Sequence, residues 1–258
     1  MKICINYGHA LSGAGTGAVG IKKESEETRN TGKEVVTYLK GNSTHEILVA
    51  DFEGEDNYVK ATNFANSEGV DLFVSIHFNS GAGDLTGNGV TTGTEVLIGH
   101  LGSSALDEAQ RIVNNISKLG FKNRGIKERP DLYVLKHTKM GACLVECAFL
   151  DDMDDMKAYN PKLMAKAIAE GILNKTISEQ NNVVSSFKNG DYSGRKARVN
   201  TDVLRVRYNR GTGYDIIGKL SKGETVNLNY CLNKWVSIEG FRGNNGLGYV
   251  HTDYLELV

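Results

Sequence analysis

The sequence predicts an α/β domain with a largely parallel sheet, followed by a small all-β module. Up to about residue 174, apolar strand-like runs alternate with amphipathic helical patterns, which is typical of strands joined by crossover helices. After residue 198 the pattern changes to short alternating segments separated by glycine-containing turns, which favours a small β-barrel. The stretch between is polar. We therefore expect three parts, at residues 1–175, a linker at 176–197, and residues 198–258.

The first domain opens with a strand and a glycine-rich loop. The loop contains neither GxGxxG nor GxxxxGK[ST], so a phosphate-binding role has little support. From Glu24 to Leu39, acidic residues in the first turn and apolar Val35 and Val36 favour a helix. The same reasoning along the chain predicts further strands at 47–50, 71–79, 94–98 and 142–150, and helices at 57–67, 103–119, 151–159 and 161–174.

The strand at 71–79 is the centre of the predicted sheet. Its dense run of Leu, Phe, Val and Ile is too short for a helix and suits a strand covered on both faces. It leads to His77, and His9 follows the first strand in a similar position. A histidine at such a place is either a satisfied core residue or a ligand held rigidly at the sheet edge. Other ligand-type residues at strand ends decide between the two.

Glu146 is a lone carboxylate within the apolar strand at 142–150. Burying an ionised carboxylate costs several kcal/mol unless it is paired, protonated or near a metal, so Glu146 requires a functional explanation. His9, a glutamate from the start of the first helix, and His77 would supply two imidazoles and a carboxylate. With an open fourth position, that set is typical of a hydrolytic zinc site. Glu146 would then take a proton from water and pass it to the leaving nitrogen.

Composition excludes several classes of function. The formal net charge is −1, so the chain as a whole has no attraction to nucleic acid or membrane. Residues 195–258 carry 10 basic and 6 acidic residues, a charge of +4 against −5 elsewhere, which indicates an anionic partner for the tail. The four cysteines form no CxxC pair and are expected to be free thiols. Met1 leads directly into the first strand, so we expect no signal peptide and synthesis as a cytoplasmic protein.

Several segments resemble the zinc-dependent N-acetylmuramoyl-L-alanine amidases of the amidase-3 type over residues 1–175. They are Gly8-His9, a glutamate after Gly20, Ser75-Ile76-His77-Phe78-Asn79, Asn123-Arg124-Gly125, Tyr133-Val134-Leu135 and Leu144-Val145-Glu146. The resemblance implies a twisted, mostly parallel sheet flanked by helices. It also implies hydrolysis of the amide between the lactyl group of N-acetylmuramic acid and L-alanine of the stem peptide. Where the family usually has Asp-Pro before Gly-His, this chain has Asn6-Tyr7.

The resemblance also assigns the site. It implies one Zn²⁺ held by His9, Glu24 and His77, with Glu146 catalytic. The helix glutamate is ambiguous. The family's small polar residue one turn later corresponds to Thr28 from Glu24 and to Asn30 from Glu26, and the apolar register fits Glu24 better. We therefore expect Glu24, with Glu26 as the alternative.

The tail resembles bacterial SH3 domains, which commonly bind the cell wall. Tyr214, Trp235 and Tyr249 are expected to stack on peptide or sugar, while basic residues face anionic wall polymers. The alternative is that Trp235 or Tyr249 belongs to the core of so small a barrel. An amidase, a linker and a wall-binding module without a signal peptide together predict a phage endolysin. It would stay in the cytoplasm until released to the peptidoglycan of a Gram-positive host. A bacterial autolysin, a zinc peptidase cutting within the stem peptide and an inactive wall-binding protein are the alternatives.

Overall fold

The computed structural model describes residues 1–177 and 187–258. The chain divides into two compact units, residues Met1–Ile177 and Ser178–Val258. Each has its own hydrophobic core. Within the described residues, no helix combines the length and apolar character that crossing a bilayer requires.

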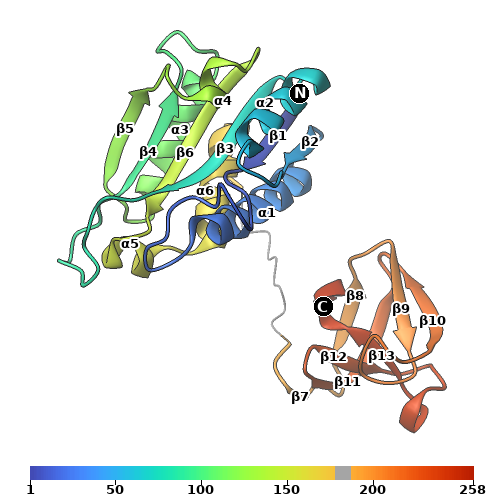
Figure 1. Ribbon diagram of the computed structural model, residues 1–258. Helices are drawn as coiled ribbons and strands as arrows, with labels where there is room; N and C mark the ends of the chain where they lie inside the picture. Colours follow the sequence, from blue (N-terminus) through green and yellow to red (C-terminus); the bar gives the residue numbers. More distant parts are fainter. Residues whose placement is uncertain (178–186) are drawn as a thin grey trace. The chain divides into compact units, whose positions relative to one another are not determined.

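The first unit is built around one six-stranded sheet (Figure 1). The strand order is β2-β1-β3-β6-β4-β5. All neighbouring pairs are parallel except β4 with β6, so β4 and β5 run against the other four strands. The strands are β1 (Lys2–Tyr7), β2 (Glu46–Ala50), β3 (Leu72–Asn79), β4 (Thr94–Ile98), β5 (Asn123–Glu128) and β6 (Gly141–Phe149). The helices are α1 (Glu24–Asn42), α2 (Asn57–Glu68), α3 (Leu106–Ser117), α4 (Tyr133–Lys136), α5 (Met153–Ala158) and α6 (Pro161–Leu173).

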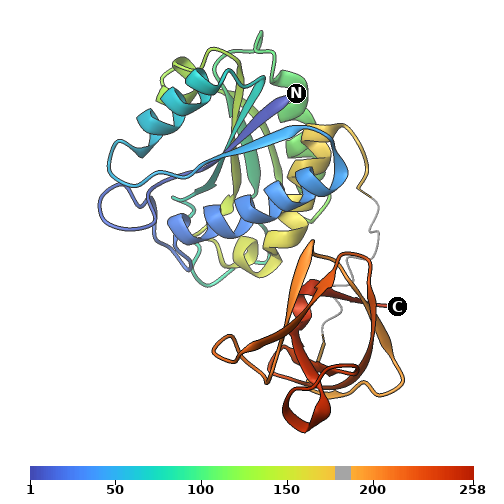
Figure 2. The ribbon, with the colours of Figure 1, turned by 90° about the vertical axis from the view of Figure 1, so that its right-hand side faces the viewer.

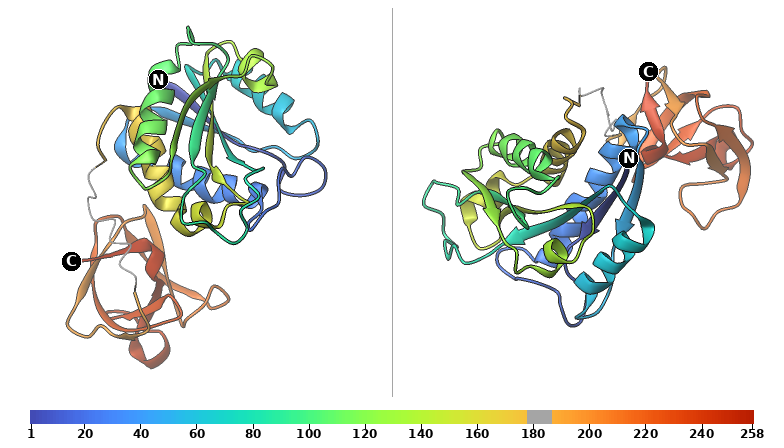
Figure 3. Two further views of the ribbon diagram at one scale, coloured as in Figure 1. Left: turned by 90° about the vertical axis from the view of Figure 1, so that its left-hand side faces the viewer. Right: turned by 90° about the horizontal axis from the view of Figure 1, so that it is seen from above.

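Helices cover the two faces of this sheet unequally. The helices α1, α3 and α6 pack on one face, where the larger core lies, as the two side views show (Figures 2 and 3). On the other face, α2 and α4 enclose a smaller core around Phe73, Leu97 and Leu144. The part of this second face formed by β4 and β5 carries no helix (Figure 1). One end of the second face is therefore left for a functional site.

The structure confirms the expected α/β architecture with a mostly parallel sheet. Each predicted strand and helix of the first unit is present near its expected bounds. The four cysteines are free and buried, as expected. Local patterns did not indicate that β4 and β5 would run in the opposite direction.

The second unit is all-β and antiparallel, as expected for an SH3-like barrel. Its strands follow the order β10-β9-β13-β12-β11-β8-β14, with β7 paired to β11. They are β7 (Gly190–Asp191), β8 (Lys196–Val199), β9 (Val203–Arg207), β10 (Ile216–Ser221), β11 (Thr225–Leu232), β12 (Trp235–Ile238), β13 (Gly248–His251) and β14 (Leu255–Leu257). Short 3₁₀ turns lie at η1 (Asn244–Gly246) and η2 (Thr252–Tyr254).

The second unit begins earlier than predicted. The expected linker at 176–197 overlaps β7 and the start of β8, and Phe187, Tyr192 and Ala197 lie in the core of the second unit. Ala197 is a buried position of the alternating strand β8, whereas Phe187 and Tyr192 lie outside the strands and pack on each other with ring centroids 4.9 Å apart. The boundary at 198 was therefore placed too late, while residues 178–186 of the expected linker lie outside the described part of the chain.

Candidate active site

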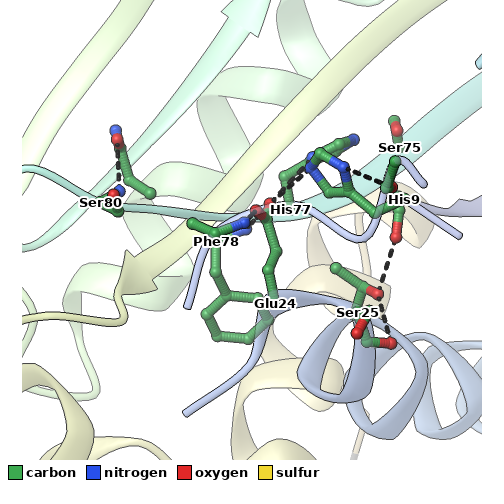
Figure 4. A network of polar contacts seen from close by, with 12 residues as sticks. His9, Glu24, Ser25, Ser75, His77, Phe78 and Ser80 are labelled. Atoms are coloured by element: carbon green, nitrogen blue, oxygen red, sulfur yellow. Dashed lines mark hydrogen bonds and ion pairs between the residues drawn. The ribbon is translucent and has the colours of Figure 1, made fainter. Parts of the chain in front are cut away.

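Three side chains converge where β1 and β3 end. The His9 Nε2 and His77 Nδ1 atoms each lie 3.1 Å from Glu24 Oε1, and Glu24 is the first residue of α1. Figure 4 shows Glu24 reaching from the helix to His77 and to the backbone of Phe78. Potential ligand atoms of the three residues all lie within 4.8 Å of one another. Segments far apart in sequence thus supply two imidazoles and one carboxylate to one point.

His9 is held by its surroundings in an unusual backbone conformation. Its φ is +67°, in the left-handed region that residues other than glycine rarely adopt. Its Nδ1 contacts the Gly15 carbonyl oxygen at 3.2 Å, and its own carbonyl accepts a hydrogen bond from Arg29 at 3.1 Å. Such strain persists only where the surrounding structure imposes it, and it is frequent at functional sites. The loop and α1 together therefore fix the orientation of this imidazole.

The carboxylate of Glu24 is buried and fully engaged. Its Oε1 accepts a hydrogen bond from the Phe78 amide at 3.1 Å, and its Oε2 accepts one from the Ala18 amide at 2.9 Å. Burial raises the pKa of Glu24, but the hydrogen bonds with His77 and His9 outweigh it and hold the pKa far below its usual range. For His77, burial lowers the pKa despite the opposing contact with Glu24. An ionised carboxylate beside an imidazole biased toward its neutral form is the protonation pattern that a cation requires.

Two glycines let the backbone approach these side chains. A Cβ at Gly8 would overlap the ring of His77, and a Cβ at Gly17 would overlap both Glu24 and the ring of His9. Gly17 also has a φ of +75°. The backbone thus packs directly against the three ligand-type side chains, and two of them, His9 and His77, also line a cavity. The donor set and this close packing both fit a metal with three protein ligands.

Glu146 lies directly beside His77 on the sheet. His77 and Glu146 are opposed residues of the parallel pair β3 and β6, and Glu146 is in turn opposed to Glu95 of β4. Opposed residues on neighbouring strands share one face of a sheet. His77, Glu146 and Glu95 thus form a row across three strands, which we call the cross-sheet row.

The carboxylate of Glu146 is buried, and one of its two oxygens, Oε2, has no hydrogen-bond partner among the described residues. Burial, and then the charges of Glu24 and Glu95, raise the pKa of Glu146 to about 8, against the opposing charge of Arg129. Desolvation next to other carboxylates favours the protonated form, so Glu146 is suited to holding a proton.

Three further residues of this region were not assigned from the sequence. Glu95 accepts hydrogen bonds from Arg124 Nε at 2.8 Å and from Asn79 Nδ2 at 3.0 Å. Asn79 and Arg124 were recognised only as parts of motifs. Glu95 has the same sequence signal as Glu146, a carboxylate inside an apolar strand, but its place opposite Glu146 follows from the order of the strands.

A cavity of about 350 Å³ opens beside the three converging residues. His9 and His77 form part of its wall, and α2 and α4 contribute Tyr58 and Tyr133. The two tyrosine rings meet edge to face, with their centroids 5.3 Å apart. An apolar cavity with a few polar groups at one end is typical of a site for a small organic moiety.

The loop between β3 and β4 is fastened by carboxylates that follow β6. Asp152 accepts a hydrogen bond from the Thr92 amide at 2.9 Å, and Asp154 accepts one from the Asn88 amide at 2.8 Å. With Asp84 they also form a second group whose ligand atoms lie close together. Oxygens of all three carboxylates accept hydrogen bonds from loop amides, which fixes the loop, while Asp84 Oδ2 is buried without a hydrogen-bond partner among the described residues.

The structure also places Glu26, the alternative ligand, and Asn6, which departs from the family pattern. Glu26 is exposed and pairs with Lys23 at 3.0 Å, away from the histidines, so only Glu24 lies between them. Asn6, which replaces the family's usual aspartate, is buried. Its side chain donates to the Ala50 carbonyl at 2.9 Å and accepts from Ser75 at 2.6 Å. It therefore links β1 to both of its neighbouring strands.

In the second unit the three aromatic residues expected to bind the wall lie in different environments. Trp235 lines a cavity of about 480 Å³ together with Arg205, Arg207 and Tyr254. Tyr249 does not contribute to a binding surface, because its side chain is only 1% exposed and its hydroxyl donates to the Asn244 carbonyl. This corrects the expectation for Tyr249 and fits the alternative that one aromatic belongs to the interior. Tyr214 is exposed but does not line the cavity.

Comparison with known proteins is consistent with both units. Residues 3–177 match the amidase-3 family, described as N-acetylmuramoyl-L-alanine amidase, and residues 202–256 match the bacterial SH3 domain. The chain is 32% identical over 249 residues to an uncharacterised protein of Clostridium perfringens, covering 91% of this chain and 71% of that protein. It is 31% identical over 229 residues to the N-acetylmuramoyl-L-alanine amidase CwlM of Bacillus licheniformis, covering 84% of each.

A solved structure shows the same fold in the first unit. The catalytic domain of the CD27L endolysin targeting Clostridia Difficile matches with a TM-score of 0.61 and 31% identity, covering 69% of this chain and 99% of that one. The family match spans the whole first unit, including the three converging side chains and Glu146. The chain belongs to the N-acetylmuramoyl-L-alanine amidase family and is a peptidoglycan amidase that also carries a bacterial SH3 domain.

Proposed function

We propose that the amidase acts with one zinc ion held by His9, Glu24 and His77, and with Glu146 as the general base. The convergence of the three ligand-type side chains at the ends of β1 and β3 carries this proposal. Two imidazoles and a carboxylate suit zinc better than calcium or magnesium, which prefer oxygen ligands alone. Glu26 is not part of this proposal because it points away from the histidines.

Glu146 supplies the proton transfers of the reaction. Zinc in this site would polarise the substrate carbonyl and lower the pKa of a water molecule toward about 7. The carboxylate of Glu146 would take a proton from the attacking water and deliver it to the nitrogen of L-alanine as the amide bond breaks. Its position beside His77 suits this role, its raised pKa lets the carboxyl group hold the proton between the two transfers, and the positive charge of a bound zinc ion would favour the ionised form that accepts it.

Analysis of the cleavage products tests the reaction. Purified peptidoglycan digested by the protein is expected to release one new free amine, on L-alanine, without new reducing sugar ends. The measurement is dinitrophenyl labelling of the digest followed by hydrolysis and chromatography. A new amine on any other residue would instead indicate a peptidase that cuts within the stem peptide.

We also propose that the cavity of the second unit binds anionic wall polymers. Arg205 and Arg207 supply positive charge, and the Trp235 ring meets His251 edge to face with centroids 5.3 Å apart. An aromatic surface beside two guanidinium groups suits a polymer with both sugar or peptide and phosphate or carboxylate groups. Tyr249 is excluded by its burial, and Tyr214 lies outside the cavity.

Trp235→Ala is expected to weaken binding to purified cell walls by about tenfold, because a central aromatic of a binding surface contributes on the order of 1–2 kcal/mol. The measurement is co-sedimentation with walls at several salt concentrations. Tyr214→Ala is the matched control, since it removes an exposed aromatic outside the cavity. Equal wall binding by the Trp235 variant and the parent protein would refute the assignment.

For its biological role we propose a lytic enzyme of the endolysin type, acting on the wall of a Gram-positive host. The likeness to the CD27L endolysin domain supports this role. An endolysin waits in the cytoplasm and lyses the cell only after the membrane is opened, whereas an autolysin is exported by the cell that makes it. Expression inside host cells distinguishes the two roles. An endolysin would lyse the cells only after the membrane is permeabilised.

A further inference from the structure

We infer that Arg124 binds a carboxylate of the stem peptide, on the leaving-group side of the scissile amide. This inference deepens the amidase function and rests on it. It concerns which stem peptides the enzyme prefers.

The guanidinium of Arg124 is held in place from two directions. Its Nε donates to Glu95 Oε2 at 2.8 Å, and its central carbon lies 4.9 Å from the centroid of the Phe149 ring. Glu95 is itself fixed, because its other oxygen accepts from Asn79. A hydrogen bond at one edge and an aromatic ring beside the group leave it little freedom. This Arg124 is therefore oriented before any ligand arrives.

Most of the donors of Arg124 remain unused. A guanidinium has five N–H donors, and the terminal nitrogens of Arg124 have no hydrogen-bond partner among residues 1–177 and 187–258. The side chain retains 33% of its exposure. Two parallel N–H groups at such an edge match the two oxygens of a carboxylate. The unused edge is thus a site for an anion that the protein itself does not supply.

The position of Arg124 connects it to the reacting bond. Arg124 lies on β5, next to Glu95 of β4, and so extends the cross-sheet row by one strand beyond Glu146. This part of the sheet face carries no helix (Figure 1). A substrate whose amide nitrogen lies at Glu146 can therefore continue across the sheet toward Arg124.

The chemistry of the substrate decides which of its two halves meets Arg124. On the muramic acid side, the lactyl carboxyl group is consumed in the scissile amide, and the sugars around it are neutral. On the peptide side, the residue after L-alanine is a D-glutamate linked through its side chain, whose α-carboxyl group is free in some walls and amidated in others. The anion nearest the reacting bond therefore lies on the peptide side. Arg124 would favour the free acid over the carboxamide.

A neighbouring arginine provides a matched control. Arg129 also acts electrostatically on Glu146, but its Nε and Nη2 donate to the two oxygens of Asp131 at 2.9 and 2.8 Å. Its bidentate edge is already occupied by a carboxylate of the protein. Replacing Arg129 changes the charge near Glu146 and leaves in place the terminal nitrogens of Arg124, which are unpartnered within the described part of the chain.

The experiment compares two synthetic muramyl peptides that differ only in a D-glutamate or a D-isoglutamine after L-alanine. The parent enzyme is expected to cleave the acid with a kcat/KM about tenfold or more above that for the amide, the usual scale of one charge-assisted bidentate contact. Arg124→Gln should bring this ratio close to one, and Arg129→Gln should leave it unchanged. Arg124→Lys, which keeps the charge opposite Glu95, should retain only part of the preference.

The ratio separates substrate binding from an indirect effect. If Arg124 only neutralised Glu95 or supported the fold, its loss would slow both substrates equally and leave the ratio as it was, which would overturn the inference. A parent enzyme that cleaved the acid and the amide substrates equally well would also overturn the inference, and this measurement requires no variant. If the parent enzyme released the dipeptide that begins with L-alanine from neither substrate, the amidase function itself would fail.

Discussion

Glu146→Gln is expected to reduce lytic activity by about 10²- to 10⁴-fold, the usual contribution of a general base. The amide has nearly the shape of the carboxylate but cannot accept the proton of the attacking water. The variant should still fold and bind zinc, because Glu146 is not among the three converging residues. Turbidity loss of a wall suspension measures the rate, and atomic emission of the purified protein measures the metal.

The thermal midpoint gives a second measurement on the same variant. Glu146 is a buried carboxylate facing Glu95, so its neutralisation should not lower the midpoint of unfolding. Glu26→Gln is the control, since that carboxylate is exposed and pairs with Lys23. Near-normal lysis by the Glu146 variant would remove it from the mechanism.

His77→Ala is expected to lose both the metal and the activity. It removes one of three ligands and leaves Glu24 buried with one imidazole fewer to stabilise its charge. The loss of zinc affinity should exceed the roughly 10- to 100-fold effect of disturbing a residue that only supports a ligand. Titration with zinc against a competing chelator measures this affinity.

The contrast between the two variants assigns their roles. Glu146→Gln should be zinc-loaded and inactive, while His77→Ala should be zinc-poor and inactive. His100→Ala is the matched control for the histidine, because His100 is exposed in the loop after β4. A fully zinc-loaded His77 variant would show that this side chain is not a ligand.

Local sequence pattern was sufficient for most elements of the first unit. Apolar runs and helical periodicity depend on neighbouring residues, so they located β3, β6 and α1 near their observed bounds. They could not show that β4 runs against β6, because alternation of side chains is the same in either direction. The helix α4 spans only Tyr133–Lys136, too short for its periodicity to be visible.

The parts of the site that were missed depend on strand order. Glu95 and Glu146 are 51 positions apart in the sequence, yet they oppose each other because β6 lies between β3 and β4 in the sheet. No local pattern records that order. The three converging residues were found because each stands at the end or start of an element and because their motifs resemble a family. Arg124 was seen as part of a motif, but its use became apparent only beside Glu95 and Phe149.

Because the cross-sheet row is built from opposed residues of neighbouring strands, the activity depends on the number of residues in each of those strands. Side chains alternate between the two faces, so losing one residue of β6 before Glu146 would turn that carboxylate into the core beneath α1, α3 and α6. Cys147 would then stand in its place beside His77. The loops can change in length without such an effect. The number of residues in each strand therefore determines which side chains reach the site. A single-codon deletion in β6 would abolish the site while sparing most of the hydrophobic packing.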